Sequence, residues 1–107
     1  MKVAVTAQGG ELTSELDPRF GRAAWFVIID TETGEHEGVD NSAGVNASSG
    51  AGIATGQKIA DSGVYAVITG HCGPNAERVL TSAGIRIMEK VGGTVEQAVE
   101  WFKEQQL

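Results

Sequence analysis

Apolar residues are grouped along the chain in short runs of strand length and in stripes with helical spacing. Two continuous runs, at residues 25–29 and 64–68, contain mainly Val, Ile and aromatic residues, a composition typical of strands buried on both faces. Residues 2–6 form a shorter strand pattern and residues 36–41 a weak one, while residues 85–88 alternate with period two and predict a strand near a sheet edge. We therefore predict five strands.

Two further segments, in the second half of the chain, have helical patterns. The first covers residues 51–62, where Gly52, Gly56 and Ala60 recur every four residues. A glycine costs about 1 kcal/mol in a helix relative to alanine. We expect close packing of this bare stripe against the sheet, or a ligand, to compensate for that cost. The second helix covers residues 75–83, where the spacing places four apolar side chains on one face.

A third helix begins at Thr94. Its hydroxyl can cap the helix, and Gln97, three residues later, can complete a capping box. Four apolar residues then form a stripe that we expect to face the core: Val95, Ala98, Val99 and Phe102. We interpret all three helices as structural supports.

The order of the elements, three strands followed by helix, strand, helix, strand and helix, fits one domain over residues 1–107. The first three strands can form a meander, whereas strands joined through a helix run parallel. This predicts a three-layer α/β/α fold with a mixed five-stranded sheet and helices on both faces, the layout of ribonuclease-H-like domains. Two-metal nuclease chemistry needs clustered carboxylates on central strands, and Asp30 stands alone at the end of the second strand. We therefore exclude a nuclease.

Composition limits the classes of partner. The 107 residues include 8 Lys and Arg against 14 Asp and Glu, a formal charge of −6, which excludes a broad nucleic-acid surface and leaves room only for a local anion site. The single cysteine cannot form an internal disulfide, and no apolar run approaches the ~20 residues of a membrane span. We expect a cytoplasmic protein that binds neither nucleic acid nor membrane.

Two loops carry the side chains with the most chemistry. The buried run at residues 64–68 leads into a turn, residues 70–75, that contains the only cysteine. It lies at the carboxyl end of a strand, where open α/β sheets usually bind ligands, and the following helix start favours an anion. The other loop is the long connection at residues 7–22, and connections of this length inside a compact domain are usually functional.

The motifs in these loops together resemble the dinitrogenase iron-molybdenum cofactor biosynthesis family. The matching segments keep their order and spacing over nearly the whole chain: residues 17–23, Phe26, residues 50–55, residues 70–76, Leu80 and residues 83–85. The resemblance implies a small ribonuclease-H-like domain that binds or carries a metal–sulfur cluster. It also implies cluster-assembly proteins or proteins associated with cell division as partners.

One position separates branches of this family. Members that carry the nitrogenase cofactor commonly have His-Phe-Gly in the first loop, where this chain has Arg19, Phe20 and Gly21. Arginine is always charged and cannot ligate a metal as imidazole does. The chain therefore resembles the orange-protein branch, whose molybdenum–copper sulfide cluster is not covalently bound to protein, and nitrogenase-cofactor transfer is disfavoured.

We expect three loops, near residues 17–22, 48–53 and 70–75, to converge at one end of the sheet. Guanidinium groups and backbone N–H groups there could hold a bulky anionic molybdenum–copper sulfide cluster, or a related iron/molybdenum–sulfur cluster, without protein–metal bonds. The candidate binding residues are Arg19, Phe20, Gly21, Arg22, Ser49, Gly50, Ala51, Gly52, Ile53, His71, Cys72, Gly73 and Asn75.

Several of these residues also have simpler interpretations. Cys72 could be a thiolate ligand, because thiolates suit soft metals and a helix start would lower its pKa, but lone cysteines are often small buried hydrophobes. His71 could ligate a metal, although donating a hydrogen bond to a sulfide or to a carbonyl suits it better. An arginine could simply pair with Asp17, and the serines before residue 51 could only cap a helix.

Our interpretation is a cluster-binding or carrier protein without catalytic residues. The first alternative is an enzyme with Cys72 as nucleophile and His71 as base, although adjacent residues on one turn rarely direct their side chains at each other. The second alternative is a regulatory or scaffold domain that binds another protein and no cofactor.

Overall fold

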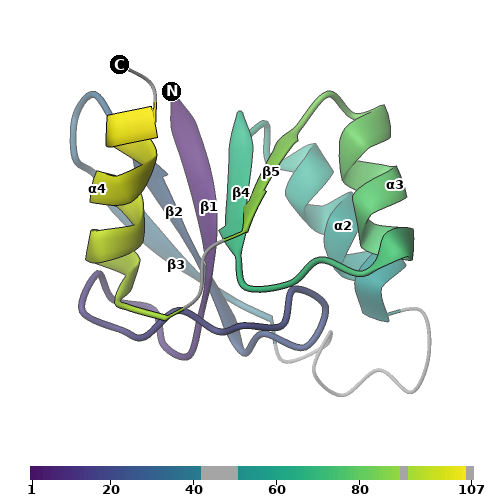
Figure 1. The fold of residues 1–107 in the computed structure, drawn as a ribbon, viewed down its shortest axis with the longest axis horizontal. Coiled ribbons are helices and arrows are strands. Elements are labelled where there is room, and N and C mark those ends of the chain that lie inside the picture. The colour runs from purple at the N-terminus through teal and green to yellow at the C-terminus, as the bar shows by residue number, and fades with distance from the viewer. Residues whose placement is uncertain (42–50, 90–91, 106–107) are drawn as a thin grey trace.

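The computed structural model describes residues 1–41, 51–89 and 92–105, and it contains the predicted elements within two residues of their predicted bounds (Figure 1). In chain order these are β1 (Lys2–Ala7), β2 (Trp25–Asp30), β3 (His36–Asp40), α2 (Ala51–Asp61), β4 (Ala66–Thr69), α3 (Pro74–Ser82), β5 (Arg86–Glu89) and α4 (Val95–Gln105). No helix in these described segments is both long and apolar enough to cross a membrane.

The five strands form one mixed sheet in the order β3-β2-β1-β4-β5. The central strand β1 runs antiparallel to β2 and parallel to β4, so that Val5 pairs with Val27 on one side and with Ile68 on the other. The β2–β3 pair is antiparallel and the β4–β5 pair is parallel. The predicted mixed sheet is confirmed, with β5 at one edge.

Helices cover both faces of the sheet: α4 lies on one side, and α2 and α3 lie together on the other (Figure 1). The side chains of β1 alternate accordingly, because Val3 and Val5 belong to the core under α4 and Ala4 to the core under α2 and α3. All three are fully buried. Each face thus has its own apolar core, and the predicted three-layer α/β/α fold is confirmed.

Helix α4 begins and packs as its sequence predicts. Thr94 accepts a hydrogen bond from the Gln97 N–H at 3.2 Å, and the Gln97 side chain accepts one from the Thr94 N–H at 3.0 Å. The predicted core-facing stripe is buried: Val95, Ala98, Val99 and Phe102. The capping box therefore sets where α4 starts, and the stripe sets which side meets the sheet.

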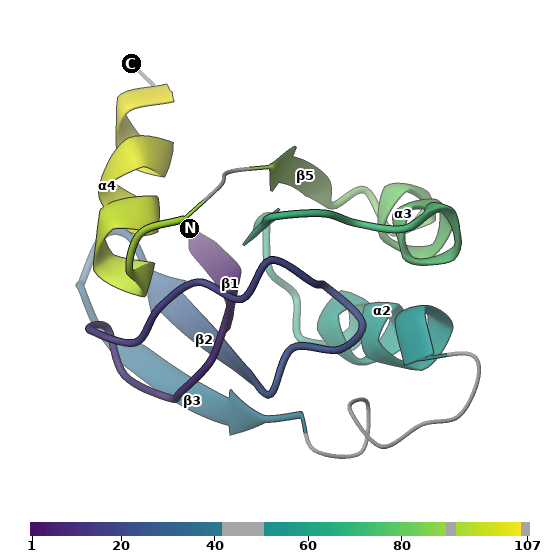
Figure 2. The same ribbon diagram turned by 60° about the horizontal axis from the view of Figure 1, so that its bottom comes forward.

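The small-residue face of α2 packs at Gly56 against a different element from the one we predicted. A Cβ atom placed on Gly56 would lie 3.3 Å from the Val79 side chain, so this glycine faces α3, not the sheet. Two helices that share one face of a sheet must also pack against each other (Figure 2). Ile59, 1% exposed, faces the core instead, and Gly56 allows α2 and α3 to approach closely.

Candidate functional site

The first loop is held against the ends of two neighbouring strands by buried polar groups. The Asp17 N–H donates to the Thr6 carbonyl at 2.9 Å, and the Thr6 hydroxyl donates to the Asp17 carbonyl at 2.7 Å. The Thr6 hydroxyl also lies 2.9 Å from the Thr69 hydroxyl. All three residues are buried. The carboxyl ends of β1 and β4 therefore fix the position of the loop.

The earlier part of this loop pairs with the segment that precedes α4. The Leu16 N–H donates to the Gly93 carbonyl, and the Val95 N–H donates to the Ser14 carbonyl, both at 2.9 Å. Glu15 also forms an isolated antiparallel bridge with Thr94. The first loop is thus hydrogen-bonded to elements at both ends of the sequence.

The loops at residues 17–22 and 70–73 lie side by side and together form what we call the rim. Arg19 and His71 form an isolated parallel bridge, and the Phe20 N–H donates to the His71 carbonyl at 3.1 Å. A Cβ atom on Gly70 would lie 2.6 Å from the Cα atom of Pro18, so the two backbones are in contact there. The structure therefore brings together two of the three loops expected to converge.

The third loop is only partly described. Ser49 and Gly50 lie outside the described residues, whereas Ala51, Gly52 and Ile53 form the first turn of α2. This turn begins at the same end of the sheet as the rim (Figures 1 and 2).

Arg19 is an exposed cation with one acidic neighbour. Its Nε atom lies 3.5 Å from Asp17 Oδ1, and its side chain is 68% exposed. The expected pairing of an arginine with Asp17 is therefore present, but exposed ion pairs contribute only about 0–1 kcal/mol. Arg22 is half-buried farther along the same loop. The Arg19 guanidinium thus remains accessible to a stronger acceptor.

We expected Phe20 to contact a ligand, but the structure buries it in the core, where it anchors the rim. Its ring is 1% exposed and packs edge-to-face on Phe26, with ring centroids 5.5 Å apart. Burying a side chain of this kind contributes about 1.5–3 kcal/mol. Phe20 was predicted from a motif, which does not reveal that the ring turns into the core between exposed Arg19 and half-buried Gly21.

The remaining candidates are Gly73 and Asn75, around the start of α3, and Gly21 on the first loop. Gly73 is the residue before the helix and has extended backbone, and Asn75 is exposed in the first turn. Gly21 is half-buried between the two rim arginines.

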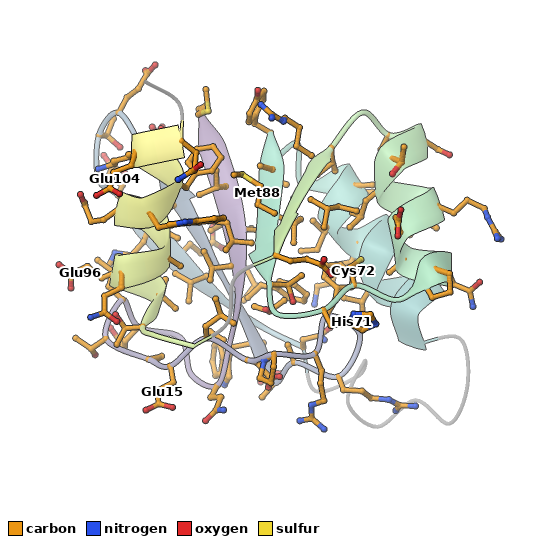
Figure 3. The ribbon with its side chains drawn as sticks, in the orientation of Figure 1. Glu15, His71, Cys72, Met88, Glu96 and Glu104 are labelled. Carbon is orange, nitrogen blue, oxygen red and sulfur yellow. The ribbon has the colours of Figure 1, made fainter. Side chains whose placement is uncertain are left out.

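His71 and Cys72 are adjacent in the chain but lie in different environments, at the rim end of β4 (Figure 3). The His71 side chain is 79% exposed. Cys72 is 6% exposed and belongs to the apolar cluster beneath α2 and α3. A buried thiol and an exposed imidazole do not form a nucleophile–base pair, and this disfavours the enzyme alternative.

Burial and two carboxylates raise the pKa of the Cys72 thiol to about 11. Burial is the largest cause, and the negative charges of Glu77 and Glu89 add to it. Our expectation that the helix start lowers this pKa is therefore wrong, because burial and like charge outweigh the helix dipole. Cys72 is a protonated thiol at neutral pH and is poorly suited to bind a metal as a thiolate.

We expect native Cys72 to react slowly with iodoacetamide. A pKa of about 11 in place of the ordinary 9.0 reduces the thiolate fraction at pH 8 about 100-fold relative to urea-unfolded protein. The same shift predicts that the free energy of unfolding is fully maintained below pH 9 and falls as the pH rises toward 11. Alkylation followed by mass spectrometry measures the first effect. Equal rates in native and unfolded protein would contradict it.

Glu89, at the end of β5, is a rim neighbour that the sequence analysis missed. Its Oε2 atom accepts a hydrogen bond from the Cys72 N–H at 3.3 Å and lies 3.7 Å from His71 Nδ1. The parallel register pairs Thr69 with Glu89, and this brings the carboxylate beside the turn after β4. Only the pairing of the last two strands could have revealed it.

A hollow of about 440 Å³ lies between α3 and β5, next to the rim, lined by Cys72, Glu77, Thr81, Ile85, Arg86, Ile87 and Glu89. The acidic residues Glu77 and Glu89 make its rim end unfavourable for an anion. Among the residues that the structure describes, no group of three or more His, Cys, Asp or Glu side chains could hold a metal ion. The donors suited to an anion are therefore those on the Arg19 and His71 side.

Comparison with known proteins finds a matching family profile and relatives that align over nearly the whole chain. A sequence profile described as dinitrogenase iron-molybdenum cofactor matches residues 1–105. A Methanocaldococcus jannaschii protein is 31% identical over 110 residues, which cover 100% of this chain and 89% of that protein.

Two solved structures share the fold. The apo form of the orange protein from Desulfovibrio gigas has a TM-score of 0.94 and 46% identity, covering 98% of this chain and 88% of that one. The NMR structure of a NifB-type protein from Thermotoga has a TM-score of 0.84 and 36% identity, covering 96% and 87%. With the profile match over nearly the whole chain, these likenesses show that the chain belongs to the dinitrogenase iron-molybdenum cofactor family.

Proposed function

We propose that this protein binds and carries an anionic metal–sulfur cluster at the rim. Membership of a family described by the iron-molybdenum cofactor supports a cofactor-associated role. The 46% identity to the orange protein favours a molybdenum–copper sulfide cluster over the nitrogenase cofactor, as does arginine at position 19. A related iron/molybdenum–sulfur cluster is the other cargo of the same chemistry.

The observation that carries this proposal is the pairing of Arg19 with His71. Residues opposite each other in a bridge direct their side chains to the same side, and both side chains are largely exposed, at 68% and 79%. The pair presents a permanently charged guanidinium next to an imidazole that can donate a hydrogen bond. Sulfides of a polyanionic cluster can accept from both, and charge-assisted hydrogen bonds are about twice as strong as neutral ones.

The donor set fits electrostatic binding better than coordination. Cys72 is buried and protonated, so its sulfur would have to lose a proton and move outward before it could bind a metal. A cluster held by guanidinium, imidazole and backbone donors can leave without breaking strong metal–protein bonds. This mode of binding suits a carrier and requires no catalytic residue.

Anaerobic reconstitution tests the proposal. We expect protein incubated with tetrathiomolybdate and Cu(I) to emerge from gel filtration coloured, with molybdenum and copper in constant ratio to protein. Because salt screens exposed charges, retention should decrease as the ionic strength of the column buffer rises. An absorption spectrum and metal analysis of the protein peak measure both effects. Colourless protein at low salt would contradict the proposal and favour a scaffold domain without cofactor.

A further inference from the structure

We propose that Glu89 is a specificity-determining residue of the rim that competes with the incoming anion. Its carboxylate accepts from the Cys72 N–H and faces His71, two groups that an anion at the rim would use. The inference rests on the proposed function, because it concerns how tightly the rim holds an anionic cluster. Glu89 in this role lowers the affinity for anions and assists their release.

Within the described residues, one Glu89 carboxylate oxygen faces two hydrogen-bond donors of the turn after β4. Oε2 lies 3.3 Å from the Cys72 backbone nitrogen and 3.7 Å from His71 Nδ1. The Glu89 side chain is 55% exposed, so solvent and a ligand can both reach it. The carboxylate therefore already occupies the place that an anion would take beside these two donors.

The position of Glu89 also couples it to the arginine side of the rim. His71 accepts a hydrogen bond from Phe20 through its carbonyl and forms a bridge with Arg19. An anion held by Arg19 and His71 must therefore approach the negative charge of Glu89, which repels it. Burial is the main cause of the raised pKa of the Cys72 thiol, and the negative charge of Glu89 adds to it after that of Glu77.

This arrangement explains how the donors of the rim are satisfied both when a cluster is bound and when it is absent. With no cluster bound, Glu89 satisfies the Cys72 N–H and holds the turn at residues 70–73 against the end of β5. A multiply charged thiomolybdate or cluster makes enough contacts with the arginine side to displace the carboxylate, whereas a singly charged anion does not. Glu89 thus favours polyanionic cargo and returns to its donors when the cargo leaves.

The substitution Glu89→Gln tests the inference. Glutamine has nearly the same shape and keeps an acceptor oxygen, so the turn is retained while the repulsion is removed. We expect Glu89→Gln to bind tetrathiomolybdate, the probe used in the titration, about fivefold to tenfold more tightly than the unsubstituted protein at low salt. Glu104→Gln is the matched control, because it removes the same charge on α4, away from the rim (Figure 3), and should change the affinity less than about twofold.

A second readout does not depend on affinity. In the unsubstituted protein the amide resonance of Cys72 should shift when tetrathiomolybdate is added, because the N–H loses its carboxylate partner. In Glu89→Gln the Cys72 amide resonance should already differ before tetrathiomolybdate is added, because the side chain that accepts from this N–H is neutral. If Glu89→Gln does not fold, Glu89→Ala replaces it, with the same expected gain in affinity.

The possible outcomes separate this inference from the proposed function. Tighter binding by Glu89→Gln but not by Glu104→Gln supports competition by Glu89. Equal or weaker binding by Glu89→Gln, or an equal gain in both variants, overturns the inference and leaves cluster binding at the rim in place. Failure of every protein to bind tetrathiomolybdate, alone or with Cu(I), overturns the proposed function and the inference with it.

Discussion

The double substitution Arg19→Ala/Arg22→Ala is expected to weaken retention of the molybdenum–copper sulfide cluster about a hundredfold or more, and each single substitution about tenfold. A hydrogen bond to a charged group contributes about 1.5–3 kcal/mol, and about 1.4 kcal/mol corresponds to a factor of ten in affinity. Arg19 is exposed beside His71, and Arg22 follows on the same loop. Titration with the cluster components, followed by metal analysis, measures the loss.

The control for this experiment removes cations elsewhere. Arg86 begins β5, at the opposite end of that parallel strand from the rim, and Lys103 lies on α4. The variant Arg86→Ala/Lys103→Ala also lowers the net charge by two and should retain the cluster nearly as well as the unsubstituted protein. Undiminished retention in Arg19→Ala/Arg22→Ala would overturn the electrostatic mechanism.

The substitution Gly70→Ala should destabilise the protein by about 1–3 kcal/mol, the usual cost of overpacking a closed contact, and should also weaken cluster binding. Its Cβ atom would lie 2.6 Å from Pro18 Cα and 2.8 Å from the Pro18 carbonyl oxygen. Backbone cannot yield as a flexible side chain does, so the two loops of the rim must separate. The midpoint of urea unfolding measures the loss of stability.

Gly73→Ala is the matched control in the same turn. A Cβ atom on Gly73 meets no atom within 4 Å, and its φ of −68° is ordinary for any residue. We expect its unfolding midpoint to lie close to that of the unsubstituted protein. If both substitutions gave the same midpoint, the contact between Gly70 and Pro18 would not be a determinant of the rim.

The fold was predictable because its main signals are local. Strands β2 and β4 are continuous apolar runs, and Thr94 with Gln97 marks the start of α4 within one turn of chain. The order of strands and helices then allows few topologies. Gly56 shows the limit of this reasoning, since its spacing indicates a bare face but not which element covers it.

The position of the site could be predicted only where a sequence motif marked the loop that forms it. The motifs around Arg19 and His71 indicated two loops that the structure brings together. The pKa of Cys72 depends on burial and on Glu77 and Glu89, and the second of these approaches only through the β4–β5 register. Contacts between distant segments are not visible in residue spacing, and the protonation state of the thiol was therefore predicted wrongly.

The hydrogen bonds between the first loop and the segment before α4 bear on biosynthesis. Leu16 and Ser14 find their partners, Gly93 and Val95, only after translation has passed those codons and the nascent segment has left the ribosome. The first loop can therefore reach its final conformation only after the segment before α4 has been synthesised and has folded against it. Formation of the rim is in this sense a late event in folding, although half of the rim belongs to an early part of the chain.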